Sequence, residues 1–441
     1  MIFALAPQAE KALNILQRAG HEAWIVGGCV RDFLLGRIPT DYDLTTSALP
    51  QEIRAAFSGY RTLDIGEKHG TVTVLLEGLP LEITTYRVDG GSSDARHPDQ
   101  VRFTRSLRED AARRDFTINA MAYAPGQGLQ DFFGGQEDLD RGILRCVGDP
   151  ARRFQEDALR ILRALRFSAT LGFPLEEETA AAAHAQAWLL EGLSAERVRG
   201  ELGRLIRGKD AGRVLEHYPE ILGVVLPELL PMIGLDQRSR YHSYDLLTHT
   251  ARAVDHTPPA LSIRLAALFH DCGKPECFTL DKDGEGHFYG HPGHSAALAA
   301  GALSRLRFPK RVQEEAVTLI RYHGAQIQPQ KLKRWLNRLG PQTFFHLLAL
   351  QRGDTLALAP AYRDRVQALD ALAAQARALL REKPCLTVRD LALNGHDMMA
   401  LGYQGREIGT ALGLLLEAVL EGRCANGREE LRQYLTQNPP L

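Results

Sequence analysis

The feature that most constrains the fold of this chain is a change in residue pattern close to residue 145. Before it, short runs of β-branched and aromatic residues bounded by Gly or Pro predict strands, and helical patterns separate some of them. After residue 150 the strand signals nearly vanish, and Ala, Leu, Arg and Glu recur at helical spacing. The 441 residues therefore predict a mixed α/β domain followed by all-helical domains.

The expected elements of the first part are short. The predicted strands cover residues 23–26, 42–45, 60–64, 71–76 and 81–86. The predicted helices cover residues 7–19, 30–35 and 51–57.

Composition and cysteine usage restrict the class of protein. Lys and Arg number 53 against 54 Asp and Glu, so an acidic polymer would have to meet local basic clusters. No apolar run approaches the roughly 18 to 20 residues that a membrane helix needs, and the apolar N-terminal stretch is too short for a signal peptide. The six cysteines form no Cys-x-x-Cys pair, which favours reduced thiols and a cytoplasmic location without membrane attachment.

The first candidate site combines a glycine turn with two carboxylates. Gly27 and Gly28 end an apolar strand and open a helix, where free backbone N–H groups suit a phosphate. Asp41 and Asp43 follow, and residues i and i+2 of a strand project to the same face. Two like charges this close are unfavourable unless a cation lies between them. Oxygen ligands suit Mg²⁺, and a pair of such ions can activate an attacking hydroxyl and stabilise a leaving pyrophosphate.

Several motifs, in the same order, resemble the bacterial tRNA nucleotidyltransferase and poly(A) polymerase family, class II of the polymerase β superfamily. These motifs are GGCVRDFLLGRIPTDYDLTTSALP, GEKHGTVTV, LEITTYRVDG, DARHPDQVRFTRSLREDAARRDFTINAMAY, DPARRFQEDALRILRALRFSATLGF and ERVRGELGRLI, and they span residues 22–210. The resemblance implies a polymerase β-like nucleotidyltransferase head, a mixed sheet with helices, followed by an all-α neck, body and HD-type tail.

The resemblance also implies a role for each matching residue. Asp41 and Asp43 would be the catalytic carboxylates that hold Mg²⁺, and Glu82 is either a third carboxylate beside them or a surface residue. The residues implied to bind the nucleotide in the head are Gly28 and Arg31 at the triphosphate, Arg114, and Asp115 and Asn119 at the ribose.

The second candidate site is the pattern QEDALRILRALRF, which predicts one helix with Asp157 and Arg160 as neighbours on one face. Taken alone, such a pair is usually a salt bridge on a helix surface. Cytosine and adenine both present an exocyclic amine beside a ring nitrogen, so a carboxylate can accept from the amine while a guanidinium donates to the ring nitrogen. Uracil and guanine would oppose a carbonyl to the carboxylate, which costs roughly 1 to 3 kcal/mol per unpaired group.

The family resemblance assigns the choice of C and A to Asp157 and Arg160, which would act as a protein template. Arg163 and Arg166 are implied as further nucleotide contacts. Arg166 has an alternative role, which is packing against Phe167 and the helix end.

A third site is predicted in the His-rich stretch from residue 242 to 323. Adjacent His270 and Asp271, which follow an apolar helix and are flanked by spaced His and Asp, are typical of metal ligands. The stretch resembles an HD phosphohydrolase domain and would hold a divalent transition metal. The implied primary ligands are His249, His270, Asp271 and Asp354, with His291 and His323 for a second ion and Lys274 for phosphate.

Together these patterns divide the chain into four expected segments. They are a nucleotidyltransferase head over 1–145, a helical neck and RNA-binding region over 146–235, an HD-type metal-binding domain over 236–360 and a helical tail over 361–441.

The predicted function is the template-independent addition of CCA to the 3′ end of tRNA from CTP and ATP, with release of pyrophosphate. Arginine-rich neck helices and a basic cluster would hold the tRNA backbone, and no obligate protein partner is implied. The members of the basic cluster are Lys331, Lys333, Arg334 and Arg338.

Other functions stay open at this point. A poly(A) polymerase of the family would tend to carry a long basic extension, which this sequence does not show. A CC-only enzyme would lack the loop RVDGGSSDARHPDQVRF, which looks complete here and so disfavours that activity. An A-only enzyme, an HD metal phosphohydrolase as the main activity, and a non-catalytic tRNA-binding protein are the further alternatives.

Overall fold

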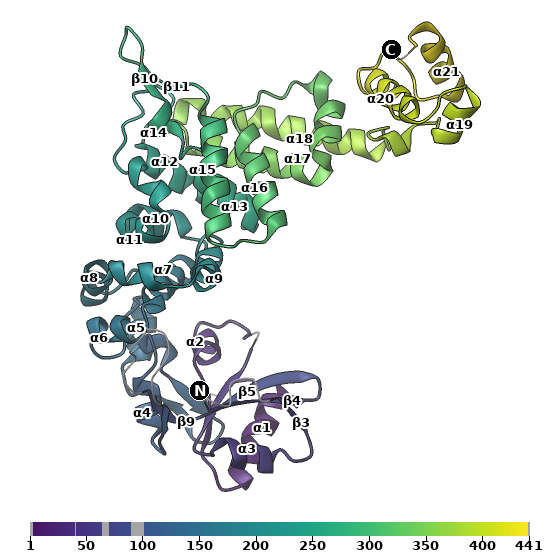
Figure 1. The fold of residues 1–441 in the computed structure, drawn as a ribbon. Helices are drawn as coiled ribbons and strands as arrows, with labels where there is room; N and C mark the ends of the chain where they lie inside the picture. Colours follow the sequence, from purple (N-terminus) through teal and green to yellow (C-terminus); the bar gives the residue numbers. More distant parts are fainter. Residues whose placement is uncertain (1–2, 40, 64–69, 90–100, 440–441) are drawn as a thin grey trace. The chain divides into compact units, whose positions relative to one another are not determined.

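The computed structural model describes residues 3–39, 41–63, 70–89 and 101–439. The chain forms two compact units, Met1–Pro227 and Glu228–Leu441 (Figure 1). The four-part division expected from the sequence stays a prediction. Residues 90–100 of the loop RVDGGSSDARHPDQVRF and residues 66–69 of GEKHGTVTV lie outside the described residues.

The first unit opens with a seven-stranded sheet of order β3-β4-β5-β2-β1-β8-β9. Strand β2 pairs antiparallel with β1 and parallel with β5, so the sheet is mixed, as predicted. The strands are β1 (Ala23–Val26), β2 (Asp43–Thr46), β3 (Arg61–Leu63), β4 (Thr71–Leu76), β5 (Leu79–Thr85), β8 (Ala122–Ala124) and β9 (Gly128–Gln130), and β6 (Arg87–Asp89) and β7 (Val101–Phe103) form a separate pair.

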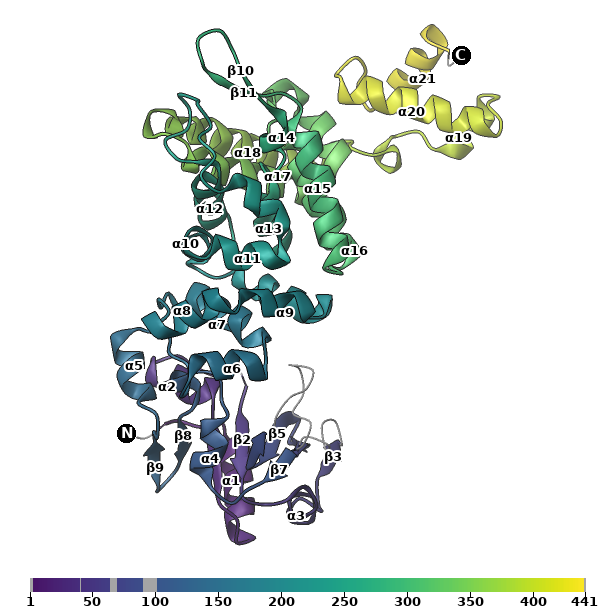
Figure 2. The same cartoon turned by 60° about the vertical axis from the view of Figure 1, so that its left-hand side comes forward.

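The sequence pattern explains how the helices cover this sheet. In β4 the buried residues are Val72, Val74 and Leu76, which is the two-residue period of a strand with one buried face. Helix α1 (Pro7–Arg18) buries an apolar stripe that includes Leu13 and Leu16, and it contacts β1 and α3 (Pro50–Ala56). Helices α2 (Gly28–Leu34) and α4 (Leu107–Ala112) complete the head (Figure 2).

Helices follow the sheet within the first unit. They are α5 (Gly135–Arg141), α6 (Pro150–Glu156), α7 (Leu159–Leu171), α8 (Glu177–Ala185), α9 (Ala195–Leu205), α10 (Ala211–His217) and α11 (Pro219–Val225). Helix α7 contacts α9, and α6 contacts α8.

The prediction of one helix through QEDALRILRALRF is wrong, because the chain breaks at Asp157. This residue is extended (φ −153°, ψ 104°) between α6 and α7. Its Oδ1 accepts a hydrogen bond from the Leu159 N–H at 3.0 Å. An aspartate can bond to nearby backbone in this way instead of continuing a helix, so Asp157 and Arg160 are not neighbours on one helix face.

The second unit is helical except for one short hairpin, β10 (Phe278–Leu280) with β11 (Gly286–Phe288). Its helices are α12 (Leu246–His256), α13 (Leu261–Phe269), α14 (Lys274–Cys277), α15 (His291–Arg305), α16 (Lys310–Tyr322), α17 (Leu332–Ala357), α18 (Val366–Arg381), α19 (Gly395–Ala400), α20 (Arg406–Leu420) and α21 (Arg428–Gln437).

Contacts among α12, α13, α16 and α17 form the body of this unit, and α17 is kinked at Gly340 (φ 73°). The last three helices enclose a separate apolar core that includes Leu415 and Leu431. Within the described ranges, no helix combines the length and the apolar character needed to cross a lipid bilayer.

Candidate nucleotide and metal sites

Three carboxylates gather where β2 begins. Asp43 is the first residue of β2, Asp41 lies two residues earlier, and Glu82 on β5 is the parallel register partner of Asp43. Desolvation by the surrounding protein raises the pKa of Asp43. The guanidinium of Arg114 lowers this pKa, whereas the nearby carboxylates of Glu82 and Asp41 raise it further. This donor set fits a divalent cation, because an ion between the carboxylates would relieve their repulsion. The predicted pair and Glu82 therefore share one site.

The glycine turn beside these carboxylates requires Gly27. Its backbone has φ 76° and ψ −134°, which L side chains rarely adopt. A Cβ atom at Gly27 would also lie 3.2 Å from Arg114 Nη1 and 3.9 Å from Asp43 Oδ2. Gly28 then begins α2, so the turn brings backbone, a guanidinium and a carboxylate close together.

Four predicted nucleotide-binding residues form a continuous hydrogen-bonded chain from α2 to α7. Arg31 Nη1 donates to Asn119 Oδ1 at 2.8 Å, and Asn119 Nδ2 donates to Asp115 Oδ1 at 3.1 Å. Arg163 donates to Asp115 Oδ2 through Nε at 2.8 Å and Nη2 at 2.6 Å. Burial raises the pKa of Asp115, but Arg163 outweighs it and holds the pKa at about 2. Hydrogen bonds therefore join helix α2 to helix α7 through Asn119 and Asp115.

The two residues predicted to choose the base are each fixed by other groups. Arg197 on α9 donates through Nη2 to both oxygens of Asp157, at 2.9 Å each. Arg160 donates to Glu156 Oε2 at 2.8 Å and to the backbone carbonyl oxygens of Arg153 and Arg113 at 3.2 and 2.9 Å. The backbone N–H of Arg160 donates to the backbone carbonyl oxygen of Asp157 at 3.0 Å, but among the described residues no hydrogen bond joins their side chains.

Sequence reasoning missed both of these supporting residues. Glu156 stands four residues before Arg160, so its ion pair was visible as helical spacing. Arg197 lies 40 residues from Asp157, and only the packing of α7 on α9 brings them together.

Arg166 is placed in the packing arrangement that the sequence offered as its alternative. Its guanidinium lies 3.5 Å from the centroid of the Phe167 ring, and its Nε donates to Glu201 Oε2 at 2.6 Å. Burial lowers the pKa of Arg166 to about 10, although Glu201 opposes this. Its nucleotide contact stays a prediction.

In the second unit, the predicted histidines and carboxylates converge on Asp271. One group consists of His249, His270 and Asp271, and another of Asp271, His291 and His323. His270 Nε2 lies 3.2 Å from Asp271 Oδ2, and His291 Nε2 lies 3.3 Å from Asp271 Oδ1. The two oxygens of one carboxylate thus face two groups of histidines.

Asp354 completes the first group. Its Oδ1 lies 3.0 Å from His249 Nε2 and 3.6 Å from His270 Nε2. Every residue named from the sequence for this metal site is therefore brought together.

The histidines are oriented by the backbone. The Nδ1 atoms of His270, His291 and His323 lie 2.8, 2.7 and 2.6 Å from the carbonyl oxygens of Ala267, Phe288 and Ile320. Such bonds fix the tautomer and leave Nε2 to bind a metal. The buried Nε2 of His270 makes no hydrogen bond among the described residues, so this donor set fits a divalent metal.

A polar pocket of about 400 Å³ adjoins this cluster. His291 and Lys274 line it together with Arg240 and Glu285, which lie 3.8 Å apart. Lys274 Nζ lies 2.7 Å from Asp271 Oδ2 and donates to Gln237 Oε1 at 2.8 Å. The predicted phosphate contact of Lys274 stays a prediction.

Known families match the same segments of the chain. A family model described as a Poly A polymerase head domain matches residues 23–145. A second, described as a probable RNA and SrmB-binding site of polymerase A, matches residues 172–232, and a third, the HD domain, matches residues 240–374. Fold and sites together define a nucleotidyltransferase with a C-terminal HD domain, and both domains imply dependence on divalent metals.

The similarity extends over the full chain for several relatives. A CCA-adding enzyme from Bacillus pumilus is 33% identical over 426 residues, which is 96% of this chain and 95% of that protein. One from a Geobacillus species is 34% identical over 432 residues, 97% and 96% of the two chains. The crystal structure of the Bacillus stearothermophilus CCA-adding enzyme in complex with CTP matches with a TM-score of 0.74 and 30% identity, covering 98% of each chain. The chain belongs to the CCA-adding enzyme family.

Proposed function

We propose that this enzyme adds C, C and A to the 3′ end of tRNA from CTP and ATP without a nucleic-acid template. The observation that carries the proposal is the full-length similarity to CCA-adding enzymes. The carboxylate cluster and the base-choosing residues all lie within one unit, Met1–Pro227, which supports their acting on the same nucleotide.

The chemistry follows from the carboxylate cluster. The tRNA 3′-hydroxyl oxygen attacks the α-phosphorus, the bond to the bridging oxygen of the β-phosphate breaks, pyrophosphate leaves, and the hydroxyl proton passes to solvent. Mg²⁺ ions held by Asp41 and Asp43 would activate the hydroxyl and stabilise the leaving charge. Gly28 and Arg31 bind the triphosphate, and the hydrogen-bonded side chains of Asp115 and Asn119 hold the ribose.

Base choice follows from the fixed pair. Asp157 accepts from the exocyclic amine of C or A, and Arg160 donates to the ring nitrogen. Arg197 holds the carboxylate in one orientation, so uracil or guanine would leave polar groups unpaired.

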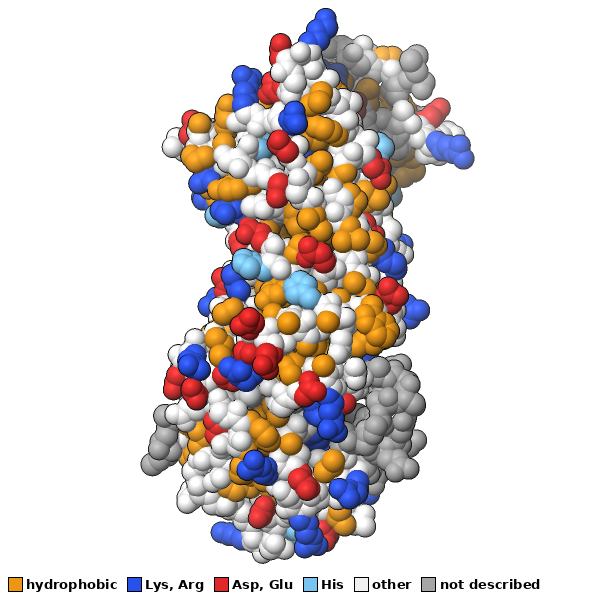
Figure 3. Space-filling model, turned by 90° about the vertical axis from the view of Figure 1, so that its left-hand side faces the viewer, with side chains coloured by type: hydrophobic (Ala, Val, Ile, Leu, Met, Phe, Trp, Pro, Cys, Tyr) orange, Lys and Arg blue, Asp and Glu red, His pale blue; other side chains and the backbone are white. Residues whose placement is uncertain are grey.

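We further propose that the tRNA backbone is held by exposed basic residues, including Lys331 and Arg338. On the face drawn in Figure 3, basic and acidic side chains are interspersed among hydrophobic and uncharged ones. Affinity then depends on local clusters, in line with the net charge of −1. The six free cysteines support a cytoplasmic location.

The test is incorporation of labelled nucleotides onto three tRNA transcripts that end before CCA, after C and after CC. CTP and ATP together should add two C residues and one A and then stop, whereas UTP and GTP should add nothing. The double variant D41A/D43A should lose all addition. Addition of CC alone, A alone or an unending A tail would contradict the proposal and identify a sibling activity.

A second activity, hydrolysis of phosphoesters at the HD site, is favoured by the two histidine groups that share Asp271. Water would add to phosphorus, the ester P–O bond would break, and the alcohol would leave with a proton. A divalent metal there would polarise the phosphoryl group. The variant H270A/D271A should lose phosphate release from p-nitrophenyl phosphate while CCA addition continues. Loss of both activities, or of neither, would contradict this assignment.

A further inference from the structure

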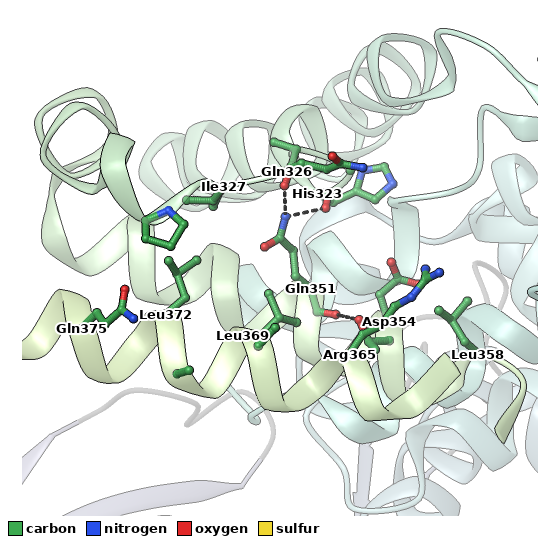
Figure 4. Close-up of a pocket in the computed structure, with 16 residues that line it drawn as sticks. His323, Gln326, Ile327, Gln351, Asp354, Leu358, Arg365, Leu369, Leu372 and Gln375 are labelled. Atoms are coloured by element: carbon green, nitrogen blue, oxygen red, sulfur yellow. Dashed lines mark hydrogen bonds between the residues drawn. The ribbon is translucent and has the colours of Figure 1, made fainter. Parts of the chain in front are cut away.

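A large pocket reaches the HD metal cluster from the side of Asp354. Its volume is about 680 Å³, and it lies between α17, α18 and the segment that follows α16 (Figure 4). Asp354 and His323 line one end of it. Among the first group of ligands His249, His270 and Asp271 are at most 2% exposed, whereas the Asp354 side chain is 26% exposed. The pocket is therefore a route from solvent to the cluster.

The wall of this pocket is largely apolar. Leu369 and Leu372 project from α18 toward the opposite side, where Ile327 and Gln351 lie (Figure 4). Gln351 Nε2 donates to the carbonyl oxygens of His323 and Ala325 at 2.8 Å each, so its own carbonyl remains as an acceptor. An apolar wall with one amide acceptor suits a ring with a polar edge.

The same pocket is also lined by a positively charged side chain, that of Arg365. The guanidinium of Arg365, which lines it, lies 5.1 Å from the centroid of the Tyr362 ring and 5.3 Å from that of Tyr241. Two aromatic rings thus fix its position. An anionic ligand with a ring-sized organic group would meet the metal ligands, this cation and the apolar wall together.

We propose that this pocket binds the organic group of a phosphoester whose phosphoryl group lies at the HD cluster. The inference rests on the proposed phosphohydrolase activity and adds its substrate class, which is a phosphoester of a ring-bearing alcohol. The metal ligands would contact only the phosphoryl group, so selectivity among esters would depend on contacts of the organic group with Leu369 and Leu372. A volume of about 680 Å³ lies within the usual range of small-molecule sites.

The test measures equilibrium binding rather than turnover. Phenylphosphonate and methylphosphonate carry the same anionic group on an unhydrolysable P–C bond and differ only in the organic part. Calorimetric titration of the Mn²⁺-loaded full chain, in a D41N/D43N background that removes the head metal site, compares the two probes. Phenylphosphonate should bind at least roughly tenfold more tightly, because the ring buries apolar surface.

Two exposed alanines on α18 give a matched pair of variants. Ala368 lines the pocket, whereas Ala374 on the same helix does not. A368W should fill the pocket and remove the preference for phenylphosphonate, while A374W should retain it. A371W fills the same wall from a second position and tests the inference again if A368W does not fold.

The outcomes separate the inference from the activity on which it rests. Equal binding of both probes, or the same preference in A368W and A374W, would overturn the pocket assignment while the HD site stands. Binding of neither probe, with Mn²⁺ bound, would overturn the phosphohydrolase proposal and this inference with it.

Discussion

Arg197 fixes the carboxylate that we propose reads the base. In R197A the Asp157 carboxylate loses two hydrogen bonds and its orientation, so we expect discrimination against uracil to fall by about tenfold or more, from roughly 1 to 3 kcal/mol of lost pairing. The ratio of CMP to UMP incorporation on tRNA lacking CCA measures this. Removal of Arg204, an exposed residue on the same helix, should leave the ratio unchanged. An unaltered ratio in R197A would show that Asp157 needs no such support.

The buried pair of Asp115 and Arg163 should make stability depend on pH. The pKa of Asp115 is about 2 in the folded chain against 3.8 for an ordinary aspartate, so the ionised group contributes about 2 kcal/mol above pH 4. This contribution is lost as the pH falls toward 2. Denaturant unfolding of the wild type and D115N should differ by at least that amount at pH 7 and by about 1 kcal/mol less at pH 3. A pH-independent difference would mean that the charge is not what stabilises the pair.

At the scale of elements, the turn between β1 and α2 depends on glycine for two reasons. G27A introduces a side chain at φ 76° and places it 3.2 Å from Arg114 Nη1, so we expect roughly 1 kcal/mol of lost stability and a large loss of nucleotide addition. G36A is the matched control, because Gly36 has φ 69° but no atom within 4 Å of the added Cβ. It should share the loss of stability and retain activity. Equal activity in the two variants would show that crowding at Gly27 is unimportant.

The elements also show how far sequence patterns reach. The strand predicted at 71–76 and the helix predicted at 7–19 agree closely with β4 and α1, because period-two and helical apolar spacing were both clear. Strands β8 and β9 were missed, since AYA and GLQ have little strand propensity and pair only within the folded sheet. The break at Asp157 was missed because a local hydrogen bond from the Leu159 N–H to the Asp157 side chain overrode a strong helical pattern.

Some residues of the candidate sites could be predicted from the sequence, and others could not. The adjacent His270 and Asp271 stand out by residue type, and the resemblance to HD domains supplied the distant ligands such as Asp354, so the members of this cluster could be named before the structure was known. Arg197 carries no such signal, because arginines are common in neck helices and its partner is 40 residues away. Long-range support for a site is fixed by helix packing, which a single sequence does not display.

At the scale of the molecule, the two candidate metal sites fall in different units. The head carboxylates lie in Met1–Pro227 and the HD ligands in Glu228–Leu441. Saturating Mn²⁺ at about 100 times Kd should stabilise each unit by about 2.7 kcal/mol. In scanning calorimetry, D271N should remove the shift of one transition and leave the other, and D41N/D43N should do the reverse. A single variant that abolishes both shifts would contradict two independent sites.

The boundary between the units lies at Pro227, beyond the residues that we propose choose the base and hold the phosphates. Asp157 and Asp43 therefore belong to one compact body, and the chain Arg31–Asn119–Asp115–Arg163 ties its two parts together. Because the proposed base-choosing and phosphate-binding residues share one unit, we expect a movement of the second unit to leave their spacing unchanged. The binding site for the incoming nucleotide would then keep the same geometry while the RNA end grows by three nucleotides.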